Sequence, residues 1–396
     1  LTRGRQIMEA LFPGLEAELI DADAAVLDMG ADVEWLNPFG WGVRFPSGFM
    51  ALSFSRYILD WLVHRRLCQF DNVRVLELSY VTCLLTNARQ TAVTGVRMRQ
   101  RDLDNLEQVQ HKELSADLVI DASGYSSQAA KWFQEIGYEP PEETKITTSM
   151  GYASRLFEIP ADFKEDWKGV YIQAAPPERT TMGVLYPIEN NRWLVGVCAT
   201  APNRPTRNET DFLEALKKQP SPHIYDVVKG AKPVTDIGIY YPPGNRLRHY
   251  ERLDRFPQGF IALGDSVCSF TPIYGQGITV AALGVVLLQQ CLKETDLAEL
   301  PHRFHKELAK VNATPWIAAT SQDAKYPSIE GLEQPPSPIE KAIGWYMDQL
   351  LQLTTKEPQV MLVLFNVFHM AQPSCSLFQP SIVWQVIRQL LTRLVS

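Results

Sequence analysis

The alternation of apolar and polar positions divides the chain into helices and strands in an order typical of an α/β protein. Residues 5–20 and 57–67 carry their apolar side chains at helical spacing. Within 72–121, and again within 145–200, short apolar runs with a period of two predict strands. Helical periodicity dominates after residue 277. The pattern predicts a strand-rich insertion between two parts of a mixed domain, followed by a helical C-terminal region.

Individual elements follow from the same pattern. Val73–Leu76, Val81–Leu85 and Val93–Met98 are predicted to form three short strands, and the charged stretch Gln100–Glu107 a turn. The segment Pro242–Arg248 is interpreted as a turn plus a basic stretch, because it begins with two prolines and a glycine and ends with two arginines.

The most informative stretch is Phe260–Leu292. A short apolar run predicts a strand that ends at Gly264-Asp265, and a loop rich in glycine leads into a long apolar helix, which we expect to be buried. Glycines before a helix let its first N–H groups approach a ligand, and the positive end of the helix dipole favours an electron-rich group. This order of a strand, an aspartate, a glycine-rich loop and a helix N-terminus suits a ligand that has a polyol tail and a ring able to take negative charge. An ordinary strand–turn–helix with closely packed glycines is the alternative.

This stretch resembles the second flavin motif of the group A FAD-dependent monooxygenases, a family that includes aromatic hydroxylases and squalene-type epoxidases. The resemblance rests on Gly-Asp, then Pro-x-x-Gly-x-Gly, then Ala281-Ala282. It implies that the aspartate holds the ribityl chain and that the proline–glycine loop lies against the isoalloxazine ring. The implied cofactor-binding residues are Gly264, Asp265, Pro272, Gly275, Gln276 and Gly277.

A second match lies upstream, where an apolar strand ends at Asp121 and continues as Asp-Ala-Ser-Gly-x-x-Ser. It resembles the Asp-Gly motif of the same family, which lies against the cofactor, and it implies Asp121 and Gly124 as cofactor-binding residues. Family members often carry arginine where Tyr125 stands and another shortly after, near Gln128. This departure weakens the inference of contacts to a pyridine nucleotide. An ordinary strand-to-helix turn is the alternative.

The helix over 57–67 is preceded by Ser55-Arg56, and Ser55 is a suitable N-cap. In the resembling family an arginine at the start of the corresponding helix reaches the flavin, which makes Arg56 a further candidate for cofactor binding. The alternative is a surface salt bridge.

Sequences of the family that this chain resembles begin with a strand and a Gly-x-Gly-x-x-Gly turn, and a later strand ends in an acidic residue. Together these segments hold the ADP half of FAD. Gly4, Gly14 and Gly30 do not have that spacing. We therefore expect either that the native protein has roughly forty more N-terminal residues, by comparison with the βαβ unit, or that this form binds FAD weakly.

Composition excludes several other functions. The net charge of −7 and the lack of a basic stripe argue against nucleic-acid binding. The six scattered cysteines contain no Cys-x-x-Cys, which indicates buried thiols in a reducing, cytoplasmic setting. His302 and His305 share a helix face, but no partner at a zinc-like spacing accompanies them, so we expect a solvated face and no metal site. No signal peptide or bilayer-spanning apolar run is recognised.

The C-terminal helix carries an apolar stripe, predicted to pack against the body of the protein or, alternatively, to contact a membrane surface. The stripe consists of Ile382, Val383, Val386, Ile387, Leu390, Leu391, Leu394 and Val395.

The resemblance implies a Rossmann-like FAD/NAD(P)-binding domain, N-terminally incomplete, formed by 1–140 and 250–325, with a β-sheet substrate domain at 141–249 and a helical region at 326–396. It implies a flavoprotein oxidoreductase, a monooxygenase that uses FAD, O₂ and NAD(P)H to hydroxylate or epoxidise an organic substrate through a flavin C4a-hydroperoxide. No catalytic side chain is assigned, because the flavin carries the chemistry. A flavin-dependent reductase of isoprenoid-like chains and a non-catalytic interaction protein remain as rivals. Several aromatic residues favour a hydrophobic substrate: Trp35, Trp41, Phe45, Tyr171 and Tyr186.

Overall fold

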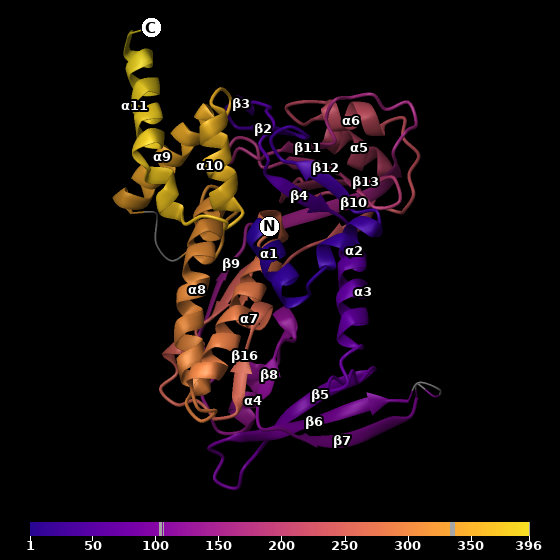
Figure 1. Ribbon diagram of the computed structural model, residues 1–396, viewed down its shortest axis with the longest axis vertical. Coiled ribbons are helices and arrows are strands. Elements are labelled where there is room, and N and C mark those ends of the chain that lie inside the picture. Colours follow the sequence, from indigo (N-terminus) through magenta and orange to yellow (C-terminus); the bar gives the residue numbers. More distant parts are fainter. Residues whose placement is uncertain (103–104, 106, 333–336, 396) are drawn as a thin grey trace. The chain divides into compact units, whose positions relative to one another are not determined.

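The computed structural model describes residues 1–102, 105, 107–332 and 337–395, and it consists of two compact units (Figure 1). The first unit contains 1–63, 147–243 and 321–396, and the second contains 64–146 and 244–320. Compactness alone does not tell which part holds a cofactor. The predicted domain division, with boundaries at 140, 249 and 325, therefore stays a prediction.

A seven-stranded sheet forms the centre of the first unit, in the order β14-β10-β13-β12-β11-β2-β3. All neighbours pair antiparallel except β11 and β2, which run parallel with Gly169 opposite Val33. The N-terminal strands therefore join a sheet built mainly from the middle of the chain. The strands are β2 (Val33–Asn37), β3 (Gly40–Trp41), β10 (Met150–Glu158), β11 (Gly169–Ile172), β12 (Met182–Ile188), β13 (Arg192–Thr200) and β14 (Gly238–Tyr240), with a separate antiparallel pair β1 (Ala25–Asp28) and β4 (Met50–Ser53).

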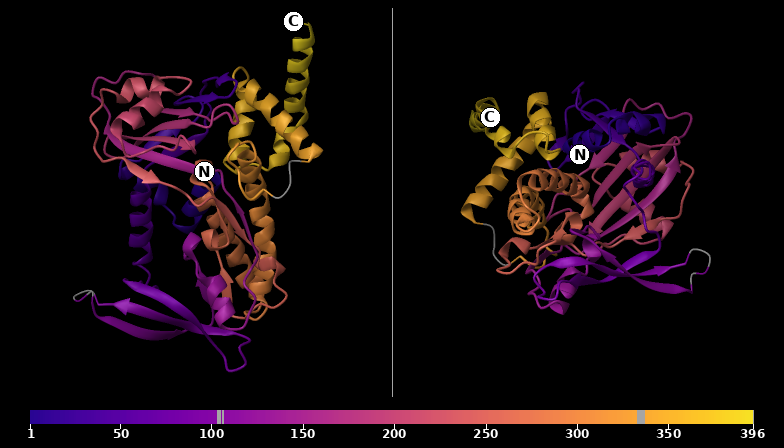
Figure 2. Two further views of the ribbon diagram at one scale, coloured as in Figure 1. Left: turned by 180° about the vertical axis from the view of Figure 1, so that it is seen from behind. Right: turned by 60° about the horizontal axis from the view of Figure 1, so that its bottom comes forward.

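Helices of the first unit cover apolar side chains at three places. On one sheet face, α5 and α6 bury Phe212 and Ile224 against β11–β13. The N-terminal helices α1 and α2 pack on α3 around Leu62. The C-terminal helices α9, α10 and α11 pack together, as both views in Figure 2 show. The helices are α1 (Thr2–Leu11), α2 (Leu15–Asp21), α3 (Arg56–Leu67, which continues into the second unit), α5 (Glu209–Lys217), α6 (His223–Val228), α9 (Pro338–Leu353), α10 (Pro358–Phe368) and α11 (Pro380–Val395).

The second unit contains three small sheets. One is an antiparallel sheet in the order β5-β6-β7, one is the parallel pair β8–β16, and one is antiparallel in the order β17-β15-β9. The strands are β5 (Ser79–Thr86), β6 (Val93–Arg101), β7 (Val109–Ser115), β8 (Val119–Asp121), β9 (Glu143–Ile146), β15 (Asn245–Arg248), β16 (Phe260–Ala262) and β17 (Cys268–Ser269).

Two long helices, α7 (Gly277–Glu294) and α8 (Leu300–Asp323), lie side by side against the strands of this unit (Figures 1 and 2). Their contact is close at Gly284, where an added Cβ would lie 3.3 Å from Leu308 Cδ1. With α4 (Ala129–Glu135) they enclose a core that contains the completely buried strand β16. Phe133 and Phe260 are at its centre, with ring centroids 5.1 Å apart.

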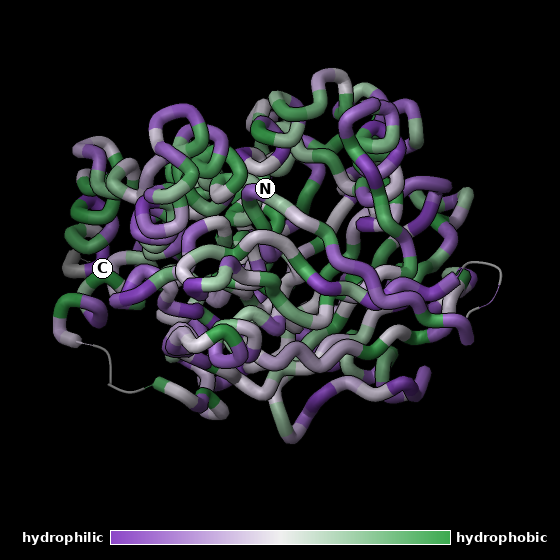
Figure 3. The backbone as a smooth tube through the Cα atoms, turned by 90° about the horizontal axis from the view of Figure 1, so that it is seen from below, coloured by the Kyte–Doolittle hydropathy of each residue, from purple (hydrophilic) through white to green (hydrophobic). Residues whose placement is uncertain are grey.

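Three segments differ from the sequence analysis. Val73–Leu76, predicted as a strand, is irregular and exposed, and among the described residues no strand pairs with it. The edge strand β7 was not predicted, because all of its residues are exposed and largely hydrophilic (Figure 3), so no apolar alternation marks it. Pro242–Arg248 is not only a turn, because Asn245–Arg248 forms β15 between β9 and β17.

Two further predictions fall partly outside the described residues. One is the turn at Gln100–Glu107, which includes 103, 104 and 106. The other is a connector that the prolines of Pro327–Pro338 predict, and it includes 333–336.

The helix α7 also differs from expectation. It is buried along one face through Val280, Leu288 and Cys291, whereas Ile278 and Leu292 on other faces are more than 40% exposed. With 18 residues and a mean hydropathy of 1.2, it meets the length and composition of a membrane span, contrary to the sequence-based expectation. Core helices of globular proteins meet the same test, so one such helix is weak support for a membrane protein.

The stripe on α11 is divided between two environments. Ile382 and Val386 are buried among α9 and α10, as predicted for packing against the body. Ile387 and Leu391 are exposed, together with Trp384.

Candidate functional site

The parallel pair β8–β16 brings the two flavin-like motifs together. Asp121, the last residue of β8, pairs with Ala262, the last residue of β16, and the Leu263 N–H donates to the Asp121 carbonyl at 2.9 Å. Because the strands are parallel, the loops that follow them leave the same edge. Ligands bind at this edge in open α/β sheets. Two segments about 140 residues apart in sequence are therefore neighbours, and each continues as a single 3₁₀ turn, η1 (Gly124–Ser126) and η3 (Gly264–Ser266).

The carboxylate of Asp121 holds both turns. One oxygen accepts hydrogen bonds from the Ser123 N–H at 3.0 Å and the Ser123 hydroxyl at 2.5 Å, and the other accepts one from the Ser127 hydroxyl at 2.5 Å. Ser266 Oγ lies 3.4 Å from the first oxygen and accepts a hydrogen bond from the Gly124 N–H at 2.9 Å. Asp121 is only 5% exposed, so its side chain orders the loops rather than facing solvent.

Asp265, by contrast, is exposed, although Ser266, the residue that follows it, is buried. A Cβ added to Gly124 would lie 4.0 Å from Asp265 Cβ, and one added to Gly277 would lie 3.7 Å from Asp265 Oδ1. Gly124, Asp265 and Gly277 therefore lie close together at the strand ends, where an exposed carboxylate is next to two positions without side chains.

The loop before α7 is open at Gly275. Gly275 has φ +60°, in the left-handed region that favours glycine, and a Cβ there would meet nothing within 4 Å. It follows the turn η4 (Pro272–Tyr274), which begins with proline. The side chain of Gln276, the N-cap residue of α7, makes no capping hydrogen bond, and a helix N-terminus directs backbone N–H groups towards an electron-rich group.

Gln276 has a different role from the residues around it. Its side chain is 6% exposed, and Nε2 donates to the Pro315 carbonyl of α8 at 3.1 Å. This bond fixes the loop on α8 and leaves the backbone of Gln276, rather than its amide, for a ligand.

The sequence analysis did not identify Arg248, whose side chain donates hydrogen bonds to both motif loops. Arg248 is 3% exposed, and its guanidinium donates to the Ser266 carbonyl at 2.8 Å, the Ser127 carbonyl at 3.3 Å and Glu143 Oε1 at 2.8 Å. One side chain thus binds a carbonyl from each motif loop. A signal was present, because arginines alternate in Arg246-Leu247-Arg248, but the segment was interpreted as a turn plus a basic stretch and not as a strand.

Arg246, from the same strand, lies over the Tyr125 ring with its guanidinium carbon 3.8 Å from the ring centroid, and it also donates to the Tyr125 carbonyl. An arginine therefore stands beside the first motif although none follows Gly124 in sequence. Burial lowers the pKa of Arg246, and the charge of Arg248 lowers it further. Burial alone would raise the pKa of Glu143, but hydrogen bonds from Lys145 and Arg248 bring it below its usual value, so Glu143 is ionised and balances the arginines.

Arg56 belongs to the first unit. Its guanidinium is largely exposed and pairs with Asp60 at 3.2 Å on the same helix. The salt bridge weighed in the sequence analysis is therefore present, and a contact between Arg56 and flavin stays a prediction.

The two histidines considered as metal ligands are in unlike environments. His302 is exposed, whereas His305 is 2% exposed, so the expectation of a solvated face is wrong for His305. Its Nδ1 donates to the Pro301 carbonyl at 2.7 Å and its Nε2 accepts from the Ala262 N–H at 3.1 Å, which requires the neutral ring. No cluster of three metal-ligating side chains occurs among the residues described.

The aromatic residues taken to favour a hydrophobic substrate are largely used for packing in the first unit. Trp35, Phe45 and Tyr171 pack with Phe365 of α10, and Trp41 lies 4.9 Å from the His223 ring. Burial raises the pKa of the Tyr186 phenol to about 12.

No protein-family model matches the chain. A relative in Mycobacterium tuberculosis, protein Rv3254, is 27% identical over 367 residues, which cover 90% of this chain and 76% of the relative.

Solved structures resemble the chain over most of its length. The flavin-dependent brominase Bmp2 matches with a TM-score of 0.61 and 14% identity, over 93% of this chain and 87% of its own. The myxobacterial chondrochloren halogenase CndH matches with a TM-score of 0.59 and 16% identity, over 87% and 78%. Pseudomonas aeruginosa PqsL, solved with 2-aminobenzoylacetate, matches with a TM-score of 0.54 and 17% identity, over 92% and 87%. The chain therefore has the fold of FAD-dependent halogenases and monooxygenases, as predicted.

Proposed function

We propose that the protein is an FAD-dependent oxidoreductase, and that the flavin binds where the two motif loops meet. The observation that carries this proposal is the proximity of Gly124, Asp265 and Gly277 at the carboxyl ends of β8 and β16. An accessible carboxylate, glycines without side chains and an uncapped helix N-terminus are the features that a polyol tail and an electron-rich ring require.

Each residue of the site has a role in this proposal. Asp265 accepts hydrogen bonds from the hydroxyls of the ribityl chain. Backbone N–H groups between Gly275 and Gly277 stabilise negative charge at the edge of the ring, helped by the dipole of α7. Asp121, Ser266 and Arg248 keep the two loops in register. FAD, when bound, would supply the electron transfer and the activation of O₂ that amino-acid side chains lack.

The reaction that we favour is transfer of one oxygen atom from O₂ to a hydrophobic organic substrate, by hydroxylation or epoxidation, with NAD(P)H as the reductant. The likeness to PqsL, a probable FAD-dependent monooxygenase, supports oxygen transfer. The likeness to the brominase Bmp2 and the halogenase CndH gives halogen transfer as a second candidate. The proposal includes the domain division given in the sequence analysis. Residues 1–140 and 250–325 bind FAD, and residues 141–249 face the substrate.

The test is the visible absorbance spectrum of protein expressed from its native reading frame, with the 396-residue chain beside it, both with FAD supplied. Flavin bands that remain after gel filtration support the proposal. If neither form retains flavin, the interaction-protein alternative is favoured. Once a substrate is known, product mass after turnover under ¹⁸O₂ with bromide present separates oxygen transfer, halogen transfer and reduction.

A further inference from the structure

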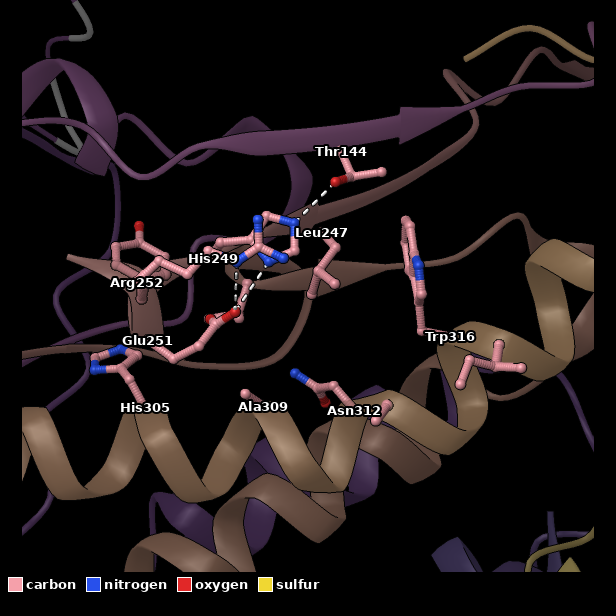
Figure 4. Close-up of a pocket in the computed structure, with 13 residues that line it drawn as sticks. Thr144, Leu247, His249, Glu251, Arg252, His305, Ala309, Asn312 and Trp316 are labelled. Carbon is pink, nitrogen blue, oxygen red and sulfur yellow. Dashed lines mark hydrogen bonds and ion pairs between the residues drawn. The ribbon is translucent and has the colours of Figure 1, made fainter. Parts of the chain in front are cut away.

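A cavity of about 360 Å³ lies within the second unit, between α8 and the segment that runs from β15 into residues 249–252 (Figure 4). Its volume is at the lower end of the range of small-molecule sites, about 300–1,000 Å³. Ala309 of α8 and Leu247 of β15 face it. Ala313, also on α8, lines it as well. Small side chains on the helix therefore create the space.

The carboxylate of Glu251 lies at one end of the cavity and is held by a hydrogen bond. Glu251 Oε1 accepts a hydrogen bond from His249 Nδ1 at 3.0 Å, and His249 Nε2 is 2.8 Å from the Thr144 hydroxyl. Burial alone would raise the pKa of Glu251, but the hydrogen bond from His249 brings it below its usual value, so Glu251 is ionised. Arg252 lies 3.7 Å from Glu251 and 3.2 Å from Glu142, so two carboxylates share its charge. The surroundings favour a neutral ligand over an anion.

Asn312 supplies the second polar group. Figure 4 shows its side chain rising from α8 towards Leu247 and His249, and it is only 2% exposed. Within the described part of the chain the Asn312 amide has no hydrogen-bond partner. Buried amides are normally paired, because an unpaired one loses its hydration without compensation. The amide offers a donor and an acceptor side by side to whatever occupies the cavity.

The opposite end of the cavity is aromatic. Trp316, one turn beyond Asn312 on α8, lines the cavity with its indole ring (Figure 4). An indole next to a donor–acceptor pair is complementary to a flat ring that carries an amide. The carboxylate of Glu251 accepts a further N–H from such a group.

We propose that this cavity binds a small neutral aromatic amide. The ring of the ligand packs on Trp316, and its carboxamide pairs with Asn312 and donates to Glu251. The site does not depend on flavin binding, because none of its residues belongs to the two motif loops except Val267, which follows the second.

The test uses the 396-residue chain and two isosteric probes, benzamide and benzoate. Binding constants come from ligand-observed NMR titration. Benzamide is expected to bind saturably, with an affinity at least about tenfold higher than that of benzoate, because benzoate has no N–H and repels Glu251. Equal binding of the two probes, or no binding of either, would overturn the proposal and leave ordered water as the partner of Asn312.

Variants test the assignment of the residues. Asn312→Leu keeps the side-chain size, removes the paired donor and acceptor, and is expected to weaken benzamide binding about tenfold. Ala313→Leu fills the cavity and is expected to abolish benzamide binding. It tests the site independently in case Asn312→Leu does not fold. Asn203→Leu is the matched control, since Asn203 is exposed and lies in the first unit. Benzamide binding that survives in Ala313→Leu would contradict the site.

Discussion

The Gly124 N–H donates to Ser266 Oγ at 2.9 Å, and this hydrogen bond joins two turns that are separated by about 140 residues of sequence. Ser266 is completely buried, so water does not replace it as the acceptor. The bond ties the glycine of the first flavin-like motif to the residue that follows Asp265 in the second. The geometry around Asp265 therefore depends on both motifs.

Replacing Ser266 by alanine tests this dependence. The Gly124 N–H would lose its acceptor, and we expect the free energy of unfolding to fall by about 1–2 kcal/mol. Flavin affinity is expected to fall less than in Asp265→Ala, because Ser266 orders the loops without facing the ligand. Chemical denaturation and flavin titration measure the two effects. Ser126→Ala is the control, because Ser126 is exposed. Unchanged stability in Ser266→Ala would show that the turns are held by other bonds.

Asp265→Ala tests the proposed anchor of the flavin. Asp265 is exposed, so its removal leaves the core intact, and hydrogen bonds to a charged group typically contribute about 1.5–3 kcal/mol. We expect flavin affinity to drop at least about tenfold with an unchanged midpoint of thermal unfolding. The readout is flavin absorbance per protein after gel filtration. The exposed Asp254, changed to alanine, serves as the matched control. Normal occupancy in Asp265→Ala would remove Asp265 from the site.

Gly277→Val tests the position of the loop. A Cβ at Gly277 is in ordinary contact with Asp265 Oδ1 at 3.7 Å, so a valine fits the protein but extends into the proposed ligand space. We expect flavin binding to be lost while stability changes by less than about 1 kcal/mol. Gly344→Val on α9 is the control, because a Cβ there meets nothing within 4 Å. A Gly277→Val protein that retains flavin would show that the ring lies elsewhere.

The sequence predicted the fold and both motif loops because their signals are local. An apolar strand that ends at Asp121 or Leu263, followed by small residues, is legible without knowledge of the rest of the chain. The resemblance to a flavin family then supplied the order of the elements, and the likeness to solved structures confirmed the fold.

What the sequence could not predict depends on partners distant in the chain. Arg248 was assigned to a basic stretch next to a turn, because its role arises only when β15 pairs with β9 and its guanidinium reaches two loops. His305 was expected on a solvated face because helical spacing does not tell which side of α8 contacts β16. The edge strand β7 carries no apolar pattern, since none of its residues is buried.

Arg248→Met tests the link between the two motif loops. The change leaves two carbonyls without a donor and Glu143 without its buried partner. We expect the free energy of unfolding to fall by at least about 2 kcal/mol, and flavin affinity to fall as well. Arg252→Met is the control, because Arg252 is mostly exposed and its ion pairs are expected to contribute less than about 1 kcal/mol. Arg248→Lys should restore part of the stability, but one ammonium cannot bond both loops as the planar guanidinium does. Full flavin affinity in Arg248→Lys would contradict that bridging role.

His305 predicts how stability depends on pH. Burial lowers its pKa to about 4, whereas in the unfolded chain its pKa is near the ordinary 6.5. Between these values the unfolded state binds a proton that the folded state excludes, so stability falls as pH decreases from 6.5 towards 4. From pH 7 to pH 5 this group alone removes roughly 2 kcal/mol. Chemical denaturation at the two pH values should show that loss in the unmodified protein and in His302→Gln, whose exposed ring lies three residues away. In His305→Gln the difference between pH 7 and pH 5 should shrink by that amount, even if the variant is less stable at both. An undiminished difference would mean that another group titrates instead.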